Sequence, residues 1–224
     1  MRKIEDIRLF KSDEMNESIG SYFAGKKLNA AVFRIVMNLR EHDFSFGDFD
    51  HLYVVFIPGD SSGMPVMSDK IDRYSPWYRQ CFVPVGKDFF DRLNHSDSHE
   101  KIISIIKDIL VTYFSSENFS PDKIAGCVNS AINQGENMLM KFKEKKTAKR
   151  RAVIFLRYTD DCEYYPLLRI FDSDDNLLYE KDLKRCTTLD GFGDIQLGLK
   201  KITIKPRKNA FTEKMSPVVF EYIK

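Results

Sequence analysis

The feature that most constrains the fold is a change in the spacing of apolar residues near the middle of the chain. Between residues 98 and 142, apolar side chains recur every three or four positions, as on one face of an α-helix. From residue 153 onward they alternate with polar ones, as in β-strands. Chains that keep the two periods apart are typical of the α+β class. We therefore predict an α+β protein, with a mixed or antiparallel sheet and two long helices in its first half and a strand-rich antiparallel second half.

Helices are predicted at three places in the first half. Residues 12–25 indicate an amphipathic opening helix, with a serine and two acids at its start. A long helix begins near Ser98 and carries a broad apolar stripe, which suits packing on a sheet. A second long helix begins at Ser120-Pro121, an N-cap with proline in the first helical position, and runs toward Phe142. Gly135 is a point at which this helix can bend.

Strands are predicted on both sides of these helices. The clearest is at residues 52–57, a β-branched and aromatic run closed by Pro58-Gly59. Residues 30–40 fit both a strand and a helix. We favour the strand, because the turn-rich residues 42–50 would join it to 52–57 in an antiparallel hairpin. Further strands are predicted at 77–85, 153–158, 164–171, 177–181, 200–205 and 217–223, and a short helical turn at 88–93.

The length of the chain suits one large domain or two small ones, since it has 224 residues. The segment 143–151 separates the two periods, but it is short and charged, unlike a linker rich in proline, glycine and serine. We therefore expect a single α+β domain over residues 1–224 that divides, if at all, into two lobes near 143–151.

The composition indicates a cytoplasmic protein. The longest apolar stretches are strand-sized, well short of the ~20 residues that a membrane-spanning helix needs, so no contact with a membrane is expected. The first six residues mix bases with acids and no apolar region follows, so no secretory signal is expected. The cysteines form no C-x-x-C pair, and we expect reduced thiols instead of a zinc ribbon or a redox pair. They are Cys81, Cys127, Cys162 and Cys186.

One motif points to a serine hydrolase. Residues 59–63 read Gly-Asp-Ser-Ser-Gly, match G-x-S-x-G, follow a strong strand and resemble the opening of the SGNH esterases. The resemblance implies a nucleophilic serine at Ser61 and a base histidine near the C-terminus. Pro65 follows where a helix should start, and the last histidine of the chain is His99. We therefore expect a structural turn, and no catalytic residue, at this place.

Other patterns point weakly to acid–base or metal chemistry. His42 and His51 flank an acidic loop, and an enzyme that acts through residues 42–62 is one alternative function. His95 and His99 have the spacing of a metal pair within a helix, but the residues between them are typical of a cap before a helix. We expect no metal ligands and no cofactor.

Two short segments are candidates for contact with a protein partner. Trp77, Tyr78 and Arg79 belong to the residue types that are enriched at binding hot spots. Asp172, Asp174 and Asp175 lie in a turn that resembles the start of an EF-hand loop but lacks its later ligands, so we predict an acidic hairpin turn. If the neighbouring strands pair as a hairpin, residues 160–163 would extend it into one acidic patch.

The densest basic segment lies at residues 141–151. A nucleic-acid-associated protein that uses this run is a second alternative function. Basic residues at the end of a helix complement its dipole, and no aromatic residues are interleaved for base stacking. The net charge is only +2, which neither drives nor forbids binding to nucleic acid. Because the basic run lacks the stacking pattern of such proteins, we do not expect nucleic acid to be the partner.

Two segments, Phe-Asp-His-Leu-Tyr at 49–53 and Pro-Trp-Tyr-Arg at 76–79, resemble those of small bacterial immunity proteins of the polymorphic-toxin, contact-dependent inhibition type. The resemblance is one of general character. It implies a non-catalytic protein of the bacterial cytoplasm that neutralises a cognate toxin by direct binding. A nuclease toxin would call for an acidic contact surface, which the turn at 172–175 would supply.

Overall fold

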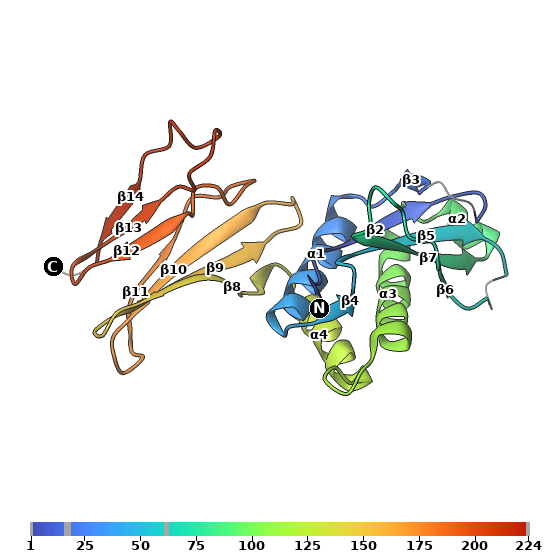
Figure 1. The fold of residues 1–224 in the computed structure, drawn as a ribbon, viewed down its shortest axis with the longest axis horizontal. Helices are drawn as coiled ribbons and strands as arrows, with labels where there is room; N and C mark the ends of the chain where they lie inside the picture. Colours follow the sequence, from blue (N-terminus) through green and yellow to red (C-terminus); the bar gives the residue numbers. More distant parts are fainter. Residues whose placement is uncertain (1, 16–18, 61–62, 223–224) are drawn as a thin grey trace. The chain divides into compact units, whose positions relative to one another are not determined.

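The computed structural model describes residues 2–15, 19–60 and 63–222 (Figure 1). The chain divides into two compact units, Met1–Gly135 and Glu136–Lys224. The division lies at the end of a helix, ahead of the basic segment at 143–151. The first unit combines helices with a mixed sheet and the second is built from antiparallel strands, which confirms the predicted α+β class.

The centre of the first unit is a five-stranded sheet with the order β3-β2-β5-β7-β6. β2, β5 and β7 run parallel, whereas the two-residue strands β3 and β6 pair antiparallel at the edges. A separate small ladder joins β1 to β4. The strands are β1 (Arg2–Lys3), β2 (Asp6–Lys11), β3 (Ser21–Tyr22), β4 (Ser45–Gly47), β5 (His51–Pro58), β6 (Val66–Met67) and β7 (Tyr78–Val85).

Helices α1, α3 and α4 pack with one another on one side of this sheet (Figure 1). The helical segments are α1 (Lys26–Glu41), α2 (Lys87–Asp91), the 3₁₀ turn η1 (Ser96–Ser98), α3 (His99–Phe114), α4 (Pro121–Gln134) and the 3₁₀ turn η2 (Gly135–Asn137). Between the layers lies an aliphatic and aromatic core with almost no exposure to solvent. It includes Leu9, Leu28, Ile35, Leu39, Leu52, Phe56, Ile102, Ile106 and Ile109.

The prediction of a strand at 30–40 is wrong, because these residues belong to α1. Its buried positions include Leu28, Val32, Ile35 and Leu39, which recur every three or four residues. The antiparallel hairpin to residues 52–57 is wrong for the same reason. Parallel strands need a crossover, and α1 supplies it between β2 and β5, which pair in parallel.

The predicted opening helix at 12–25 is also wrong. β2 ends at Lys11, and β3 occupies Ser21 and Tyr22. Gly20 has a φ of 79°, and a Cβ atom there would meet the backbone oxygen of Lys11 at 2.3 Å. A helix interior accommodates neither feature, since both mark a tight turn between neighbouring strands. Residues 16–18 of the predicted helix lie outside the described residues.

The helix that begins at Ser120 is confirmed over Pro121–Gln134 but not over its predicted continuation toward Phe142. The Ser120 hydroxyl accepts a hydrogen bond from the backbone nitrogen of Lys123, which is the expected N-cap. Gly135 ends the helix with a φ of 52° and does not bend it. The residues beyond form strand β8, so the basic run lies on a strand and not at a helix C-terminus.

The second unit contains two antiparallel sheets, with the orders β11-β10-β9-β8 and β12-β13-β14. Their apolar faces are buried at positions such as Ile154, Leu168, Ile195 and Ile202. The five predicted strands of this half are confirmed, and β8 and β12 were missed. The strands are β8 (Met140–Lys146), β9 (Arg151–Tyr158), β10 (Tyr164–Phe171), β11 (Leu177–Asp182), β12 (Asp194–Leu197), β13 (Lys201–Lys205) and β14 (Val218–Glu221).

Among the described helices, none has both the length and the apolar character to cross a membrane. All four cysteines are free thiols, two of them buried and two half-buried.

Candidate functional site

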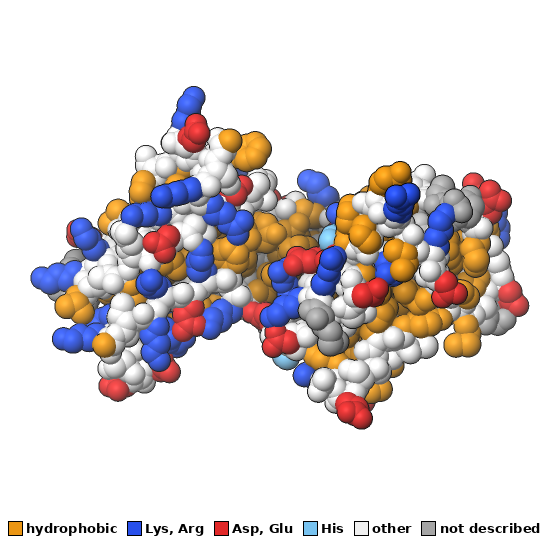
Figure 2. Space-filling view, viewed as in Figure 1, with side chains coloured by type: hydrophobic (Ala, Val, Ile, Leu, Met, Phe, Trp, Pro, Cys, Tyr) orange, Lys and Arg blue, Asp and Glu red, His pale blue; other side chains and the backbone are white. Residues whose placement is uncertain are grey.

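The 63–78 segment, from Gly63 to Tyr78, connects β5 to β7 and carries an unusual number of exposed apolar side chains. Tyr74 is 86% exposed and Trp77 is 40% exposed. Met64, Val66 and Ile71 are also exposed. Figure 2 shows hydrophobic side chains gathered over the part of the first unit where Figure 1 places β6, β7 and α3. Clustered exposed apolar residues mark a contact surface more often than single ones do.

Asp72 fixes the turn in the middle of this segment. Its carboxylate accepts hydrogen bonds from the backbone nitrogens of Tyr74 at 2.7 Å and Ser75 at 2.9 Å, and from the Tyr78 hydroxyl at 3.3 Å. The hydrogen bond from Tyr74 is the main reason why the pKa of Asp72 lies below its usual value. A charged carboxylate therefore holds the backbone that presents Tyr74.

Both ends of the segment are attached to regular structure. Near its start, Val66 and Met67 pair with β7, and the Tyr113 hydroxyl of α3 donates to the backbone oxygen of Pro65. Near its end, the backbone oxygen of Trp77 accepts from the nitrogens of Asp50 and His51, each at 3.0 Å. The Trp77 main chain is thus fixed to the sheet while its side chain meets solvent.

The structure gives the three predicted residues at 77–79 three different roles. Trp77 is exposed. The Tyr78 ring is half-buried and stacks on Tyr53, with centroids 4.5 Å apart and an interplanar angle of 15°. Arg79 is buried, and its guanidinium donates to the backbone oxygens of Pro76 and Tyr78 and to Asp48. Of these three residues, only Trp77 is placed to contact a partner. Arg79 stabilises the backbone of the segment through its hydrogen bonds to Pro76 and Tyr78.

The acidic turn at 172–176 joins β10 to β11. The Asp172 carboxylate accepts from the backbone nitrogens of Asp174 and Asn176, each at 2.9 Å, so it organises the turn. Asp175 forms an ion pair with Arg151 at 3.0 Å. The Asp174 side chain is exposed at the tip. Of the three predicted aspartates, Asp174 is the most available to a partner.

The expected acidic patch does not form. Residues 160–163 connect β9 to β10 and precede Tyr164, whereas the turn at 172–176 follows Phe171. β10 separates the two turns by seven residue steps, or about 23 Å at ~3.3 Å per residue. β9 and β10 form one hairpin, and β10 and β11 form the next, so the turns of the two hairpins lie at opposite ends of β10.

The basic run lies on β8 and on the turn to β9 within the second unit. Several of its charges are already engaged: Lys141 pairs with Glu144, and Lys143 donates to the backbone oxygens of Phe192 and Gly193. The unit has 19 Lys and Arg against 14 Asp and Glu, a net charge of +5. Figure 2 shows acidic side chains interspersed with the basic ones, in contrast to a continuous basic stripe.

The residues of the alternative enzyme site are not brought together. His51 opens β5, and Gly59 follows its other end, eight steps or about 26 Å away at ~3.3 Å per residue. The His51 ring nitrogen Nδ1 lies 2.5 Å from Asp50, and the His42 ring hydrogen-bonds to the backbone oxygen of Asn38. Ser61 itself lies outside the described residues.

The predicted metal pair is likewise separated by local structure. His95 precedes η1, whereas His99 opens α3, so the two do not share a helical face. Within the described ranges, no group of three His, Cys, Asp or Glu side chains is placed to hold a metal ion. Burial raises the pKa of the Cys81 thiol to about 12, which makes it a poor nucleophile at neutral pH.

Tyr74 was not predicted as a contact residue, although it follows an Asp-rich stretch that is typical of an ordered turn. A pattern of large apolar residues inside a loop bounded by prolines was the available signal. The chain was compared with models of protein families, with curated proteins and with solved structures, and none of the three comparisons found a match.

Proposed function

We propose that this chain is a non-catalytic protein-binding protein, and that it acts as an immunity protein that neutralises a cognate bacterial toxin by direct contact. The observation that carries the proposal is the exposure of Tyr74 and Trp77 on a segment whose backbone is fixed at both ends and in the middle.

Aromatic side chains on a rigid backbone suit protein recognition for two reasons. Trp and Tyr bury a large area for few rotatable bonds, and they are enriched at binding hot spots. A segment that is already ordered loses less conformational entropy on binding than a flexible loop does. The hydrogen bonds of Asp72 and Arg79 supply this order before any partner arrives.

The immunity role rests on the resemblance of residues 49–53 and 76–79 to small bacterial immunity proteins. In such a complex Trp77 would provide the anchor and Asp174 would act at the rim. Rim charges mainly change the rate of association, whereas buried anchors change the rate of dissociation.

The test is to co-express the chain with candidate toxin domains encoded by its neighbouring genes, and to measure both growth and the dissociation constant of each purified pair. Trp77→Ala and Tyr74→Ala should each weaken binding by ~2 kcal/mol, or about 30-fold, mainly through faster dissociation. Phe211→Ala is the matched control, because Phe211 is 88% exposed but belongs to the second unit.

Three results would contradict the proposal. The first is that none of these toxin domains binds the chain or is neutralised by it. The second is that Phe211→Ala weakens binding as much as Trp77→Ala does. The third is that Trp77→Ala loses ~3–5 kcal/mol of folding stability, the cost for a core tryptophan, and keeps its affinity.

A further inference from the structure

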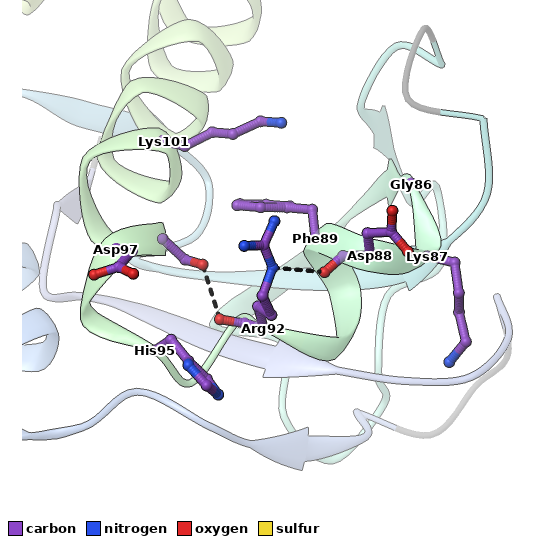
Figure 3. Close-up of a pocket in the computed structure, with 9 residues that line it drawn as sticks. Gly86, Lys87, Asp88, Phe89, Arg92, His95, Asp97 and Lys101 are labelled. Atoms are coloured by element: carbon purple, nitrogen blue, oxygen red, sulfur yellow. Dashed lines mark hydrogen bonds between the residues drawn. The ribbon is translucent and has the colours of Figure 1, made fainter.

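A cavity of about 500 Å³ lies between α2 and the beginning of α3 in the first unit (Figure 3). It begins at Gly86, directly after the last residue of β7. In open sheets with parallel strands, ligands bind beyond the carboxyl ends of those strands. β7 is one of the three parallel strands, so this cavity occupies the place where such a sheet commonly binds a ligand.

Two cations that line the cavity form no ion pair with the residues that the structure describes. Arg92 uses its Nε to donate to the backbone oxygen of Asp88 at 3.2 Å, and no described carboxylate forms an ion pair with its guanidinium. The Lys101 ammonium lies 4.3 Å from the centroid of the Phe89 ring and likewise has no ion pair with a described carboxylate. Lys87, by contrast, is neutralised by Asp91 at 2.7 Å.

Two carboxylates also line the cavity, together with His95. In Figure 3, Asp88 and Asp97 lie on either side of Arg92, and the guanidinium lies beside the Phe89 side chain. The Asp97 carboxylate accepts a hydrogen bond from Ser96, and the Ser98 hydroxyl donates to the backbone oxygen of Arg92. The hydroxyl of Ser98 thereby positions the backbone of Arg92.

A smaller cavity of about 180 Å³ adjoins the first and shares Gly86 and Lys101 with it. Its wall is mainly apolar and includes Val83, Pro84 and Ile105. The exposed Asp108 lines it as well, together with Lys101. Lys101 therefore lies between the polar cavity that contains Arg92 and a mainly apolar slot.

We propose that these two cavities bind a phosphate monoester with a small apolar or aromatic group. A phosphate dianion matches two cations, and the planar fork of an arginine guanidinium suits its oxygens. Arg92 and Lys101 bind the phosphate, Phe89 forms one wall, and the apolar slot takes the organic group. The site lies within the first unit and does not depend on Trp77 or on the proposed toxin.

The test is a titration of the full chain with phenyl phosphate, followed by calorimetry and by amide chemical shifts. Saturable binding is expected, with shifts at residues 86–101 and at slot residues such as Val83 and Ile105. Arg92→Ala and Lys101→Gln should each weaken it about 10- to 100-fold, since each removes a charge-assisted contact. Lys107→Ala is the control, because it removes a positive charge from α3 outside the cavity.

Inorganic phosphate should bind to the same residues more weakly than phenyl phosphate, because it cannot fill the slot. Equal affinities for the two would overturn the assignment of the slot. The phosphate site itself is wrong if phenyl phosphate shows no saturable binding, if Arg92→Ala and Lys101→Gln bind as tightly as the unchanged chain, or if Lys107→Ala weakens binding as much as they do. Melting temperatures of the variants show that each compared protein is folded.

Discussion

Replacement of Arg79 by alanine should release the 63–78 segment from its support. The Arg79 side chain is only 10% exposed, and its guanidinium donates to the backbone oxygens of Pro76 at 3.0 Å and Tyr78 at 2.8 Å. It also lies 5.2 Å from the Phe49 ring centroid. The ion pair with Asp48 has a length of 2.8 Å, but the Asp48 side chain is 74% exposed.

These contacts set the expected magnitude. A hydrogen bond from a charged donor contributes ~1.5–3 kcal/mol, and water can reach carbonyl groups near the surface once the arginine is gone, so the lower figure applies. Two carbonyls then account for ~3 kcal/mol. The ion pair adds only ~0–1 kcal/mol, because an exposed carboxylate is screened by solvent. Arg79→Ala should therefore cost ~3–4 kcal/mol and Asp48→Asn ~0–1 kcal/mol.

Urea denaturation followed by tryptophan fluorescence measures both values, because Trp77 is the sole tryptophan of the chain. Arg73→Ala is the control from the same segment. Arg73 is exposed, so its replacement should change the unfolding free energy by less than ~0.5 kcal/mol. The reasoning is refuted if Asp48→Asn costs as much as Arg79→Ala, since the ion pair would then hold the segment.

Two further predictions concern the thiols and the turn. In the native protein a thiol reagent should label the two half-buried cysteines first, and Cys81 and Cys127 should react only after unfolding. On the denatured, unreduced chain we expect four labels, whereas two labels would reveal a disulfide. The lowered pKa of Asp72 contributes stability that is present above its unfolded value of ~3.9 and is lost as the pH falls through the lower folded value. Between about pH 5 and about pH 3 the unfolding free energy should thus fall more in the unchanged chain than in Asp72→Asn, and equal slopes would contradict this assignment.

The strands of the second unit could be predicted from the sequence because one face of each sheet is buried and the other is not. In β9, for example, Ile154 and Leu156 are buried and alternate with half-buried Phe155 and Arg157. β8 was missed because its charges, such as Lys143 and Glu144, hide the alternation. Lys143 is held by backbone oxygens of a distant segment, which a local pattern cannot reveal.

Helix α1 could not be assigned from its own residues. Alternate positions of 30–40 are apolar, as in a strand, and the buried stripe also contains Arg34 and Asn38. Asn38 is buried because its side chain donates to the backbone oxygen of Cys127 in α4 at 2.8 Å. A polar residue that made the helix pattern look poor, Asn38, is thus satisfied by a tertiary contact that its neighbours in the sequence do not reveal.

Residue types in the sequence were enough to select part of the 63–78 segment as a candidate contact surface. They were not enough to predict the role of each residue in it. Tryptophan, tyrosine and arginine are all enriched in hot spots, so residue type alone does not separate the contact residue from the supporting ones. Burial alone distinguishes exposed Trp77 from Arg79 beneath it, and burial depends on β7 pairing with β5.

The wrong assignment of residues 30–40 also concealed the cavity beside Arg92 and Lys101. As a strand, 30–40 would pair antiparallel with 52–57, and an antiparallel sheet has no common carboxyl edge at which a ligand is expected. As the crossover helix α1, it allows β2 and β5 to pair in parallel, and the connection through the 63–78 segment places β7 beside β5 in the same direction, so that Gly86 lies beyond the carboxyl end of a parallel strand. The predicted hairpin hid the pairing of β2 with β5, and with it the parallel sheet that makes residues 86–101 a candidate site. The phosphate titration tests this position of the site, because shifts concentrated at residues 86–101 and at slot residues such as Val83 and Ile105 are expected only for a ligand bound at this edge.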